Sequence, residues 1–101
     1  METYIYVIAA DESGPVKIGY SNDPNRRLKE LQTGYPKPLS LWHQQEFHPA
    51  QAKLMEQLIH KTLRRHRSHG EWFKLDVKQA IAEVEFHVIR YSDETNLRNY
   101  L

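Results

Sequence analysis

The chain has 101 residues, 40% of them hydrophobic and 27% charged, which is the size and composition of a single globular domain. It contains no cysteine, so disulfide bonds and cysteine-ligated zinc are excluded. No apolar run approaches the roughly 18 residues of a membrane span, and no signal peptide is visible, so we expect a cytoplasmic protein.

The formal net charge is only +1, which does not indicate a general polyanion binder. The basic residues nonetheless gather in the stretch 60–69, which has no acid and holds Lys61, Arg64, Arg65 and Arg67. The first half of the chain adds Arg26, Arg27 and Lys29. A basic surface on a nearly neutral protein fits local contact with phosphates. A solvated helix face explains the same pattern equally well.

The first half of the chain predicts a hairpin followed by a helix. Residues 3–9 and 16–20 are rich in β-branched and aromatic residues and predict two strands, joined by a turn at 11–15. Asn22 or Asp23 can cap a helix with Pro24 in its first turn, ending near Gly34. The two prolines of 35–38 predict a loop.

The second half predicts one more strand and two helices. Residues 39–47 indicate a third strand, and Pro49 opens a helix that runs to about Arg65. A turn at 68–70 and a short extended piece at 72–75 precede a last helix from Val77 to about Ile89. We therefore predict an α+β fold, a small three-stranded antiparallel sheet flanked by helices, over residues 1–91, with a polar tail at 92–101.

The helix from Pro49 carries a candidate metal ligand. Its apolar face holds Met55, Leu58 and Ile59, with Glu56 at the border of that face and His60 one turn further on. A carboxylate held there could reach Mg²⁺ or Mn²⁺, which prefer oxygen ligands and often take only one or two carboxylates. From this helix alone, an ordinary Glu–His surface pair is the favoured interpretation.

Arg27 is a candidate phosphate contact. It flanks the core positions Leu28 and Leu31, so its stem could be fixed while its guanidinium grips a phosphate. A plain surface arginine is again the simpler interpretation of this residue taken alone.

The hairpin places Tyr4 and Tyr6 on one face of the first strand, and Lys17 and Gly19 on one face of the second. If the register pairs Tyr6 with Lys17, the phenol and the amine project side by side. A lysine with a lowered pKa could then take a proton from water or from the phenol. The alternative is a pair of half-buried strand aromatics beside a solvated edge lysine.

Taken together and in order, these residues form a wider pattern. Tyr4-Ile5-Tyr6, Lys17-Ile18-Gly19, Arg27 and Glu56, with KIGYS, E-x-x-x-H and GEWFKL, resemble the phage-type branch of the GIY-YIG nuclease superfamily over residues 4–75. The resemblance implies a metal-dependent endonuclease that hydrolyses phosphodiester bonds in DNA. It also implies a three-stranded antiparallel sheet flanked by helices.

The resemblance also implies a role for each matching residue. Tyr6 would position or deprotonate the attacking water, and Lys17, standing where the family has tyrosine, would lie near the same nucleophile. Gly19 would allow close packing, Arg27 would stabilise phosphate charge, and Glu56 would hold a single Mg²⁺ or Mn²⁺ ion. His60 would carry a proton or contact the phosphate. Because Tyr4 stands where the first motif has glycine and Lys17 where the second has tyrosine, the identity of the general base stays open. The expected substrate contacts are Tyr4, Gly19, Tyr20, Arg26, Arg64, Arg65 and Arg67.

Other interpretations remain. His60, His66 and His69 have poor spacing for zinc. The aromatics Tyr35, Trp42, Phe47, Trp72 and Phe73 either stack on bases or fill the core. A catalytically inactive nucleic-acid-binding module of the same fold is the main alternative to an active nuclease, and a protein-interaction adaptor is a third. Single-stranded DNA, whose bases are exposed for stacking, is slightly favoured over duplex DNA.

Overall fold

The structure, a computed structural model, describes the backbone of residues 2–99 and the side chains of residues 2–90. Its elements in chain order are β1 (Thr3–Ala9), β2 (Val16–Ser21), α1 (Pro24–Gln32), β3 (Ser40–Phe47), α2 (Pro49–Thr62), η1 (Arg64–His66), β4 (Arg67–His69), β5 (Trp72–Phe73) and α3 (Val77–Asn99). Among the described residues, no helix is both long and apolar enough to cross a bilayer. The predicted α+β class is confirmed.

The sheet has five antiparallel strands in the order β3-β1-β2-β5-β4, where the sequence predicted three. The three long strands lie where the sequence placed them. The two added strands form a small hairpin around Gly70, whose φ of 55° lies in the region that favours glycine. Strands of two or three residues are too short for an alternating pattern to reveal them, which is why the strand number was wrong.

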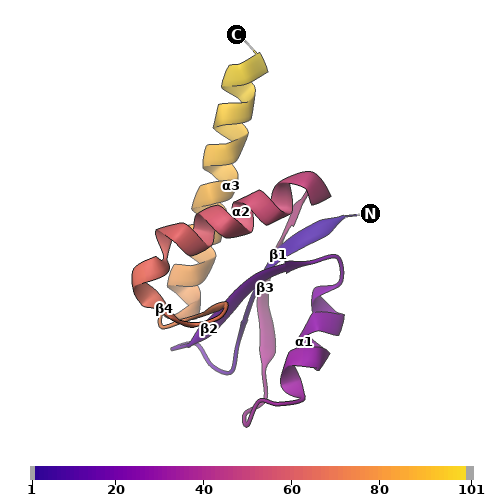
Figure 1. The fold of residues 1–101 in the computed structure, drawn as a ribbon, viewed down its shortest axis with the longest axis vertical. Helices are drawn as coiled ribbons and strands as arrows, with labels where there is room; N and C mark the ends of the chain where they lie inside the picture. Colours follow the sequence, from indigo (N-terminus) through magenta and orange to yellow (C-terminus); the bar gives the residue numbers. More distant parts are fainter. Residues whose placement is uncertain (1, 100–101) are drawn as a thin grey trace.

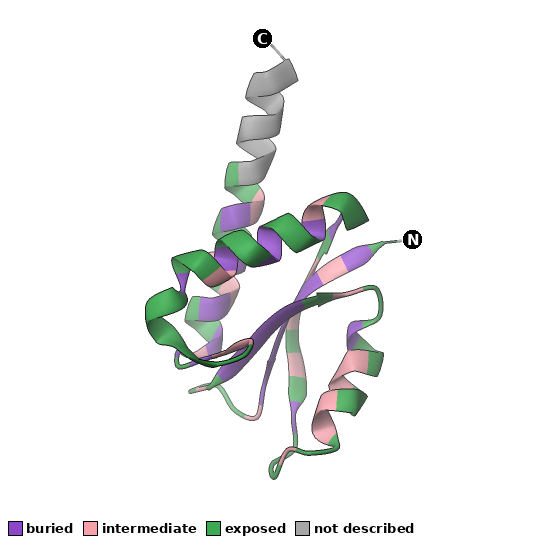
Figure 2. Ribbon diagram, viewed as in Figure 1, coloured by how far each residue is buried: buried purple, intermediate pink, exposed green. Residues whose placement is uncertain are grey.

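The sheet separates α2 and α3 from α1 (Figures 1 and 2), and each of its faces carries its own hydrophobic cluster. Ile5, Val7 and Ile18 point to one face, where they pack with residues of α2 and α3. Tyr6 and Ile8 point to the other face, where they pack with Leu28 and Leu31 of α1 and with Leu39. Because successive strand residues alternate between the faces, β1 and β2 contribute to both clusters and are buried on both sides.

Side chains set where the first two helices begin. Asp23 accepts a hydrogen bond from the backbone N–H of Arg26 at 3.1 Å and Pro24 follows it, so the predicted cap of α1 is confirmed. His48 caps α2 by accepting from the N–H of Ala50. The buried residues of α2 are Ala52, Met55, Glu56 and Ile59.

Three details of the helices differ from the prediction. α2 ends at Thr62 rather than near Arg65, because the chain tightens into the η1 turn. Leu58 is exposed rather than buried, since α2 presents a narrower face to the sheet than its apolar pattern suggested. α3 continues to Asn99 instead of ending near Ile89, so the predicted boundary at residue 92 falls within a helix. The side chains of 91–101 lie outside the described residues.

Phe73 is the core anchor of the short β4–β5 hairpin, so we expect Phe73→Ala to be strongly destabilising. Its ring is fully buried and its backbone pairs with Val16. Loss of the ring should lower the free energy of unfolding by about 3–5 kcal/mol in urea titrations followed by circular dichroism. Phe86→Ala is the matched control, because that ring is 54% exposed and its loss should change stability by less than about 0.5 kcal/mol. Equal losses from the two variants would contradict this account of the hairpin.

Candidate functional site

The candidate site lies along the edge of β2 that β5 leaves open. β5 pairs with β2 only at Val16 and Lys17. Beyond that point the N–H of Ile18 donates to the carbonyl of Glu71 at 3.2 Å, and the carbonyl of Ile18 accepts from Nε2 of His60 at 2.7 Å. The N–H of Tyr20 donates to the carboxylate of Glu56. Polar groups of α2 and of the β4–β5 turn therefore take the place of a neighbouring strand.

Glu56 is the most perturbed acid of this edge. It is 9% exposed, and burial together with the negative charge and hydrogen bond of Glu71 raises its pKa to about 7. The Tyr20 N–H and the Lys17 ammonium act in the opposite direction. Its Oε2 is buried without a hydrogen-bond partner among the described residues. A proton or a cation bound to Oε2 would provide the missing partner.

Glu71 belongs to the site, and the sequence analysis did not single it out. Its Oε1 lies 3.2 Å from Nζ of Lys17, and it also hydrogen-bonds Glu56. It lies in a turn, where no helical or strand period assigns a face to a side chain. One signal in the sequence could have found it, because Glu71 is the only acid between Glu56 and Asp76, in an otherwise basic segment. The site therefore holds two carboxyl groups and one ammonium.

His60 has a fixed tautomer. A carbonyl can only accept, so Nε2 carries the hydrogen that bonds Ile18, and Nδ1 faces Oε1 of Glu56 at 4.0 Å. The ring also rests against Phe73, with ring centroids 5.0 Å apart. Burial lowers the pKa of His60, so the imidazole is neutral at neutral pH. Nδ1 then carries a free lone pair that can accept a proton.

The register of the hairpin differs from the one considered above. Tyr6 pairs with Gly19, and Lys17 pairs with Ile8, so Tyr6 and Lys17 share a face but are offset by two residues. A Cβ added at Gly19 would overlap the phenol oxygen of Tyr6 and lie 2.7 Å from its Cζ. The phenol lies directly on the strand backbone, and only glycine leaves room for it.

Tyr6 and Arg27 form a pair across the sheet and α1. Tyr6 is 1% exposed, and this burial raises its pKa, while a hydrogen bond from the Arg27 guanidinium acts against that shift. The phenol is therefore protonated at neutral pH. Arg27 is half-exposed, and its Nη1 lies 3.7 Å from Glu30. The bond to Tyr6 fixes one side of the guanidinium, and the exposed side can meet an anion.

The remaining predicted contacts are spread around this centre. Tyr20 is 41% exposed, next to the backbone that bonds Glu56. Tyr4 donates to Glu2 at 3.2 Å and lies opposite Glu46, so carboxylates surround its phenol and make it a poor phosphate contact. The exposed arginines are Arg26, which is paired with Glu30, and Arg64, Arg65 and Arg67 beside the β4–β5 turn.

Of the five aromatics considered above, Phe47, Phe73, Trp72 and Tyr35 pack in or against the core, and Trp42 is the exposed one. Phe73 and Phe47 are buried. Trp72 stacks on Tyr35 with ring centroids 5.1 Å apart and planes 20° apart, and the ammonium of Lys17 lies 5.7 Å from the Trp72 ring. Trp72 therefore helps to hold Lys17 in place at the site.

Glu56 and Glu71 are the carboxyl groups that could hold a metal ion at this edge. Within the described part of the chain, no group of three or more His, Cys, Asp or Glu side chains is placed to hold one. The unpartnered Oε2 of Glu56 and its second carboxylate neighbour do suit a hard cation that keeps most of its water ligands.

Comparison with known proteins identifies a family. The model of the T5orf172 domain matches residues 3–88, whereas no curated protein and no solved structure matches the chain. The resemblance to the GIY-YIG superfamily was therefore wrong, since the match is to a different family. Its three-letter strings, such as Lys17-Ile18-Gly19, are too short to define a family alone. The T5orf172 domain is a nuclease-like, DNA-binding family, so the function of the chain concerns nucleic acid.

We expect stability to fall as pH rises through the titration range of Glu56. The unfolded carboxyl ionises near 4.5, whereas the folded one keeps its proton until about pH 7. The contribution is complete below pH 4.5 and is lost by pH 7, with a total of about 3 kcal/mol. Urea titrations at pH 4.5 and 8 should show this loss in the wild type and little of it in Glu56→Gln. Glu46→Gln on β3 removes an exposed carboxyl whose pKa is raised by the neighbouring Glu2, and it should keep most of the loss. An unchanged pH dependence in Glu56→Gln would refute the assignment.

Proposed function

We propose that this chain, which belongs to the T5orf172 domain family, is a metal-dependent endonuclease that hydrolyses phosphodiester bonds in DNA. The observation that carries the proposal is the gathering of two carboxyl groups, an ammonium and a neutral imidazole at the open edge of β2. A domain that only binds nucleic acid has no need of a half-protonated carboxyl pair in contact with its substrate. The electrostatic cost of such a pair is characteristic of catalytic sites.

Lys17 and Arg27 supply the positive charge for the phosphate. The ion pair with Glu71, at 3.2 Å, holds the Lys17 ammonium at the site, which supports an electrostatic role. Arg27, fixed by Tyr6, presents a planar donor to the phosphate oxygens. Lys17 lies two residues along β2 from Gly19, which pairs with Tyr6, and Tyr6 bonds Arg27, so a phosphodiester on this face would meet both cations.

His60 is the proposed general base. Its Nδ1 is unprotonated at neutral pH, and the 4.0 Å gap to Oε1 of Glu56 suits a bridging water. The water oxygen forms a bond to phosphorus while its proton moves to Nδ1, and the bond from phosphorus to the leaving sugar oxygen breaks. The leaving oxygen takes a proton from solvent. Tyr6, protonated and buried, positions Arg27 and does not act as a base.

Glu56 is the proposed ligand of Mg²⁺ or Mn²⁺. Oε2 of Glu56 has no other hydrogen-bond partner among the described residues, and binding a cation would also relieve its repulsion with Glu71. When bound, such an ion supplies positive charge for the phosphate and lowers the pKa of a ligating water. The chain contributes few ligands, which agrees with the preference of Mg²⁺ for water and substrate phosphate.

Single-stranded DNA is the proposed preferred substrate. The exposed ring of Tyr20 lies next to the Glu56 edge and offers a surface for one unpaired base. The exposed arginines Arg26, Arg64, Arg65 and Arg67 supply phosphate contacts on either side.

Cleavage of end-labelled DNA tests the activity. We expect cuts with Mg²⁺ or Mn²⁺, none with EDTA, and a rate at least about 100-fold lower in Glu56→Gln, because the variant keeps the size of the side chain and removes its charge. Glu46→Gln should cleave like the wild type. Retained DNA binding without cleavage in any metal would instead identify an inactive nucleic-acid-binding module of this family.

Strand preference depends on Tyr20 in this proposal. Tyr20→Ala should weaken binding to a single-stranded oligonucleotide by about 5- to 100-fold in fluorescence anisotropy, and should change duplex binding much less. Leu54→Ala removes a similarly exposed side chain, 48% against 41% for Tyr20, from α2 and serves as the control. Equal weakening of both strand forms would point to backbone contact alone and contradict the preference.

A further inference from the structure

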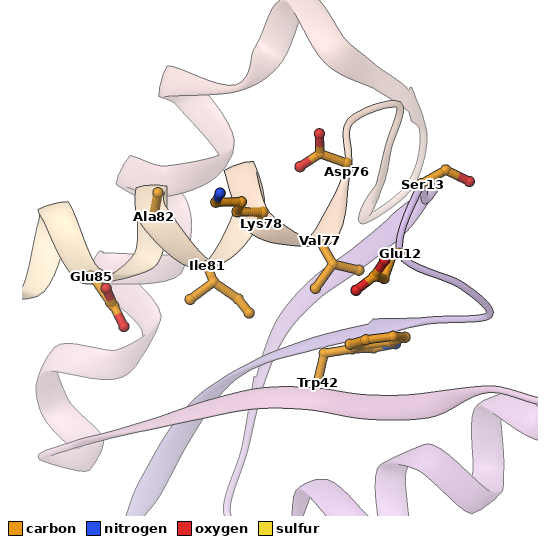
Figure 3. A pocket seen from close by; sticks show the side chains of 9 residues that line it. All are labelled: Glu12, Ser13, Trp42, Asp76, Val77, Lys78, Ile81, Ala82 and Glu85. Atoms are coloured by element: carbon orange, nitrogen blue, oxygen red, sulfur yellow. The ribbon is translucent and has the colours of Figure 1, made fainter.

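A second surface lies beside α3 (Figure 3), whose Val77 packs in the hydrophobic cluster on the face of the sheet opposite to Tyr6. It is a groove of about 770 Å³ between β3, the β1–β2 turn and the beginning of α3. β3 and β2 lie on opposite sides of β1, so Trp42 on β3 is separated from the open edge of β2 by β1. None of the groove residues belongs to the candidate site.

Trp42 forms the floor of the groove. Its Nε1 donates to the carbonyl of Ala9 at 3.1 Å, which fixes the ring, and the side chain is 37% exposed. Val77 and Ile81 of α3 lie next to it and complete an apolar base (Figure 3). A fixed indole with an open face is a preformed platform for a flat or cationic group.

The rim of the groove is acidic. Glu12, Asp76 and Glu85 line it, and Lys78 is the one basic residue among the nine that do so. Glu12 and Glu85 form no ion pair within the described residues, whereas Oδ1 of Asp76 accepts from the N–H of Gln79 at 2.7 Å. Three carboxylates against one ammonium disfavour DNA phosphate here and attract a positive charge.

We infer that this groove docks a basic peptide segment of a partner protein, with an arginine side chain stacked on Trp42. Guanidinium is planar and weakly hydrated, so it stacks on an indole and pairs with carboxylates at the same time. The volume exceeds that of one side chain, which leaves space for neighbouring residues of the segment. This interaction would leave the β2 edge free, and it does not depend on the proposed nuclease activity.

Titration of the ¹⁵N-labelled protein with a synthetic peptide tests the inference. The probe is a short peptide of alternating arginine and glycine, with a glutamate–glycine peptide as the charge-reversed control. We expect a saturable shift of the Trp42 indole signal at low salt, and weakening by several-fold at high salt because the attraction is screened. Trp42→Leu assigns the signal among the two tryptophans of the chain.

Two charge variants make the test selective. Glu85→Gln, on the exposed surface of α3, should weaken peptide binding by about 3- to 5-fold, and Glu46→Gln, elsewhere on β3, should not. A peptide affinity that is unchanged in Glu85→Gln, or peptide binding that does not shift the Trp42 indole signal, would overturn the inference. A Trp42 shift that grows with protein concentration alone would overturn it too, and would identify a second copy of this chain as the occupant.

Discussion

The site depends on the mismatch in length between β2 and its outer neighbour. β2 has six residues and β5 has two, so the backbone of Ile18 and Tyr20 must find partners that are not strands. An unpaired edge in this position would be costly in a buried setting and prone to aggregation in an exposed one. Side chains of α2 take the place of the missing strand, because His60 bonds the carbonyl of Ile18 and Glu56 bonds the N–H of Tyr20. The groups that complete the sheet are thereby fixed in position, and a fixed position is what a catalytic group needs.

The same arrangement leaves the negative charge of Glu56 only partly compensated. The charge of Glu71 is compensated by the adjacent Lys17. The charge of Glu56 is stabilised only by the backbone N–H of Tyr20 and more weakly by the Lys17 ammonium. The pair can hold a proton, which is why the pKa of Glu56 is raised, or it can hold a cation. Proton and metal ion then compete for one oxygen, so a metal would bind more tightly as pH rises toward 7. The fold carries a stability cost at neutral pH that binding of a cation would offset.

Local patterns predicted the elements of the fold better than their contacts. The strand alternation of 3–9 and the Asp23–Pro24 start of α1 are encoded within a few residues, and both were predicted correctly. Glu56 could be placed near the core by helical period. The register of Tyr6 against Gly19 and the position of Glu71 depend on turns and on residues distant in sequence, which no period specifies. Leu58 shows the converse, because an apolar residue at helical spacing stays exposed when its neighbours leave no surface to cover it.

The net charge of +1 conceals a strong separation of charge. Exposed arginines flank the β4–β5 turn at one end of the strand order, and carboxylates line the groove beside β3 at the other end. A phosphate backbone approaching the protein is therefore attracted to one edge and repelled by the other, which orients the molecule before any contact forms. Salt screens charges over a Debye length of about 8 Å at physiological ionic strength, so this orienting force acts only when the nucleic acid is close to the protein. In the proposed function, charge placement rather than total charge would therefore direct DNA to the open edge of β2.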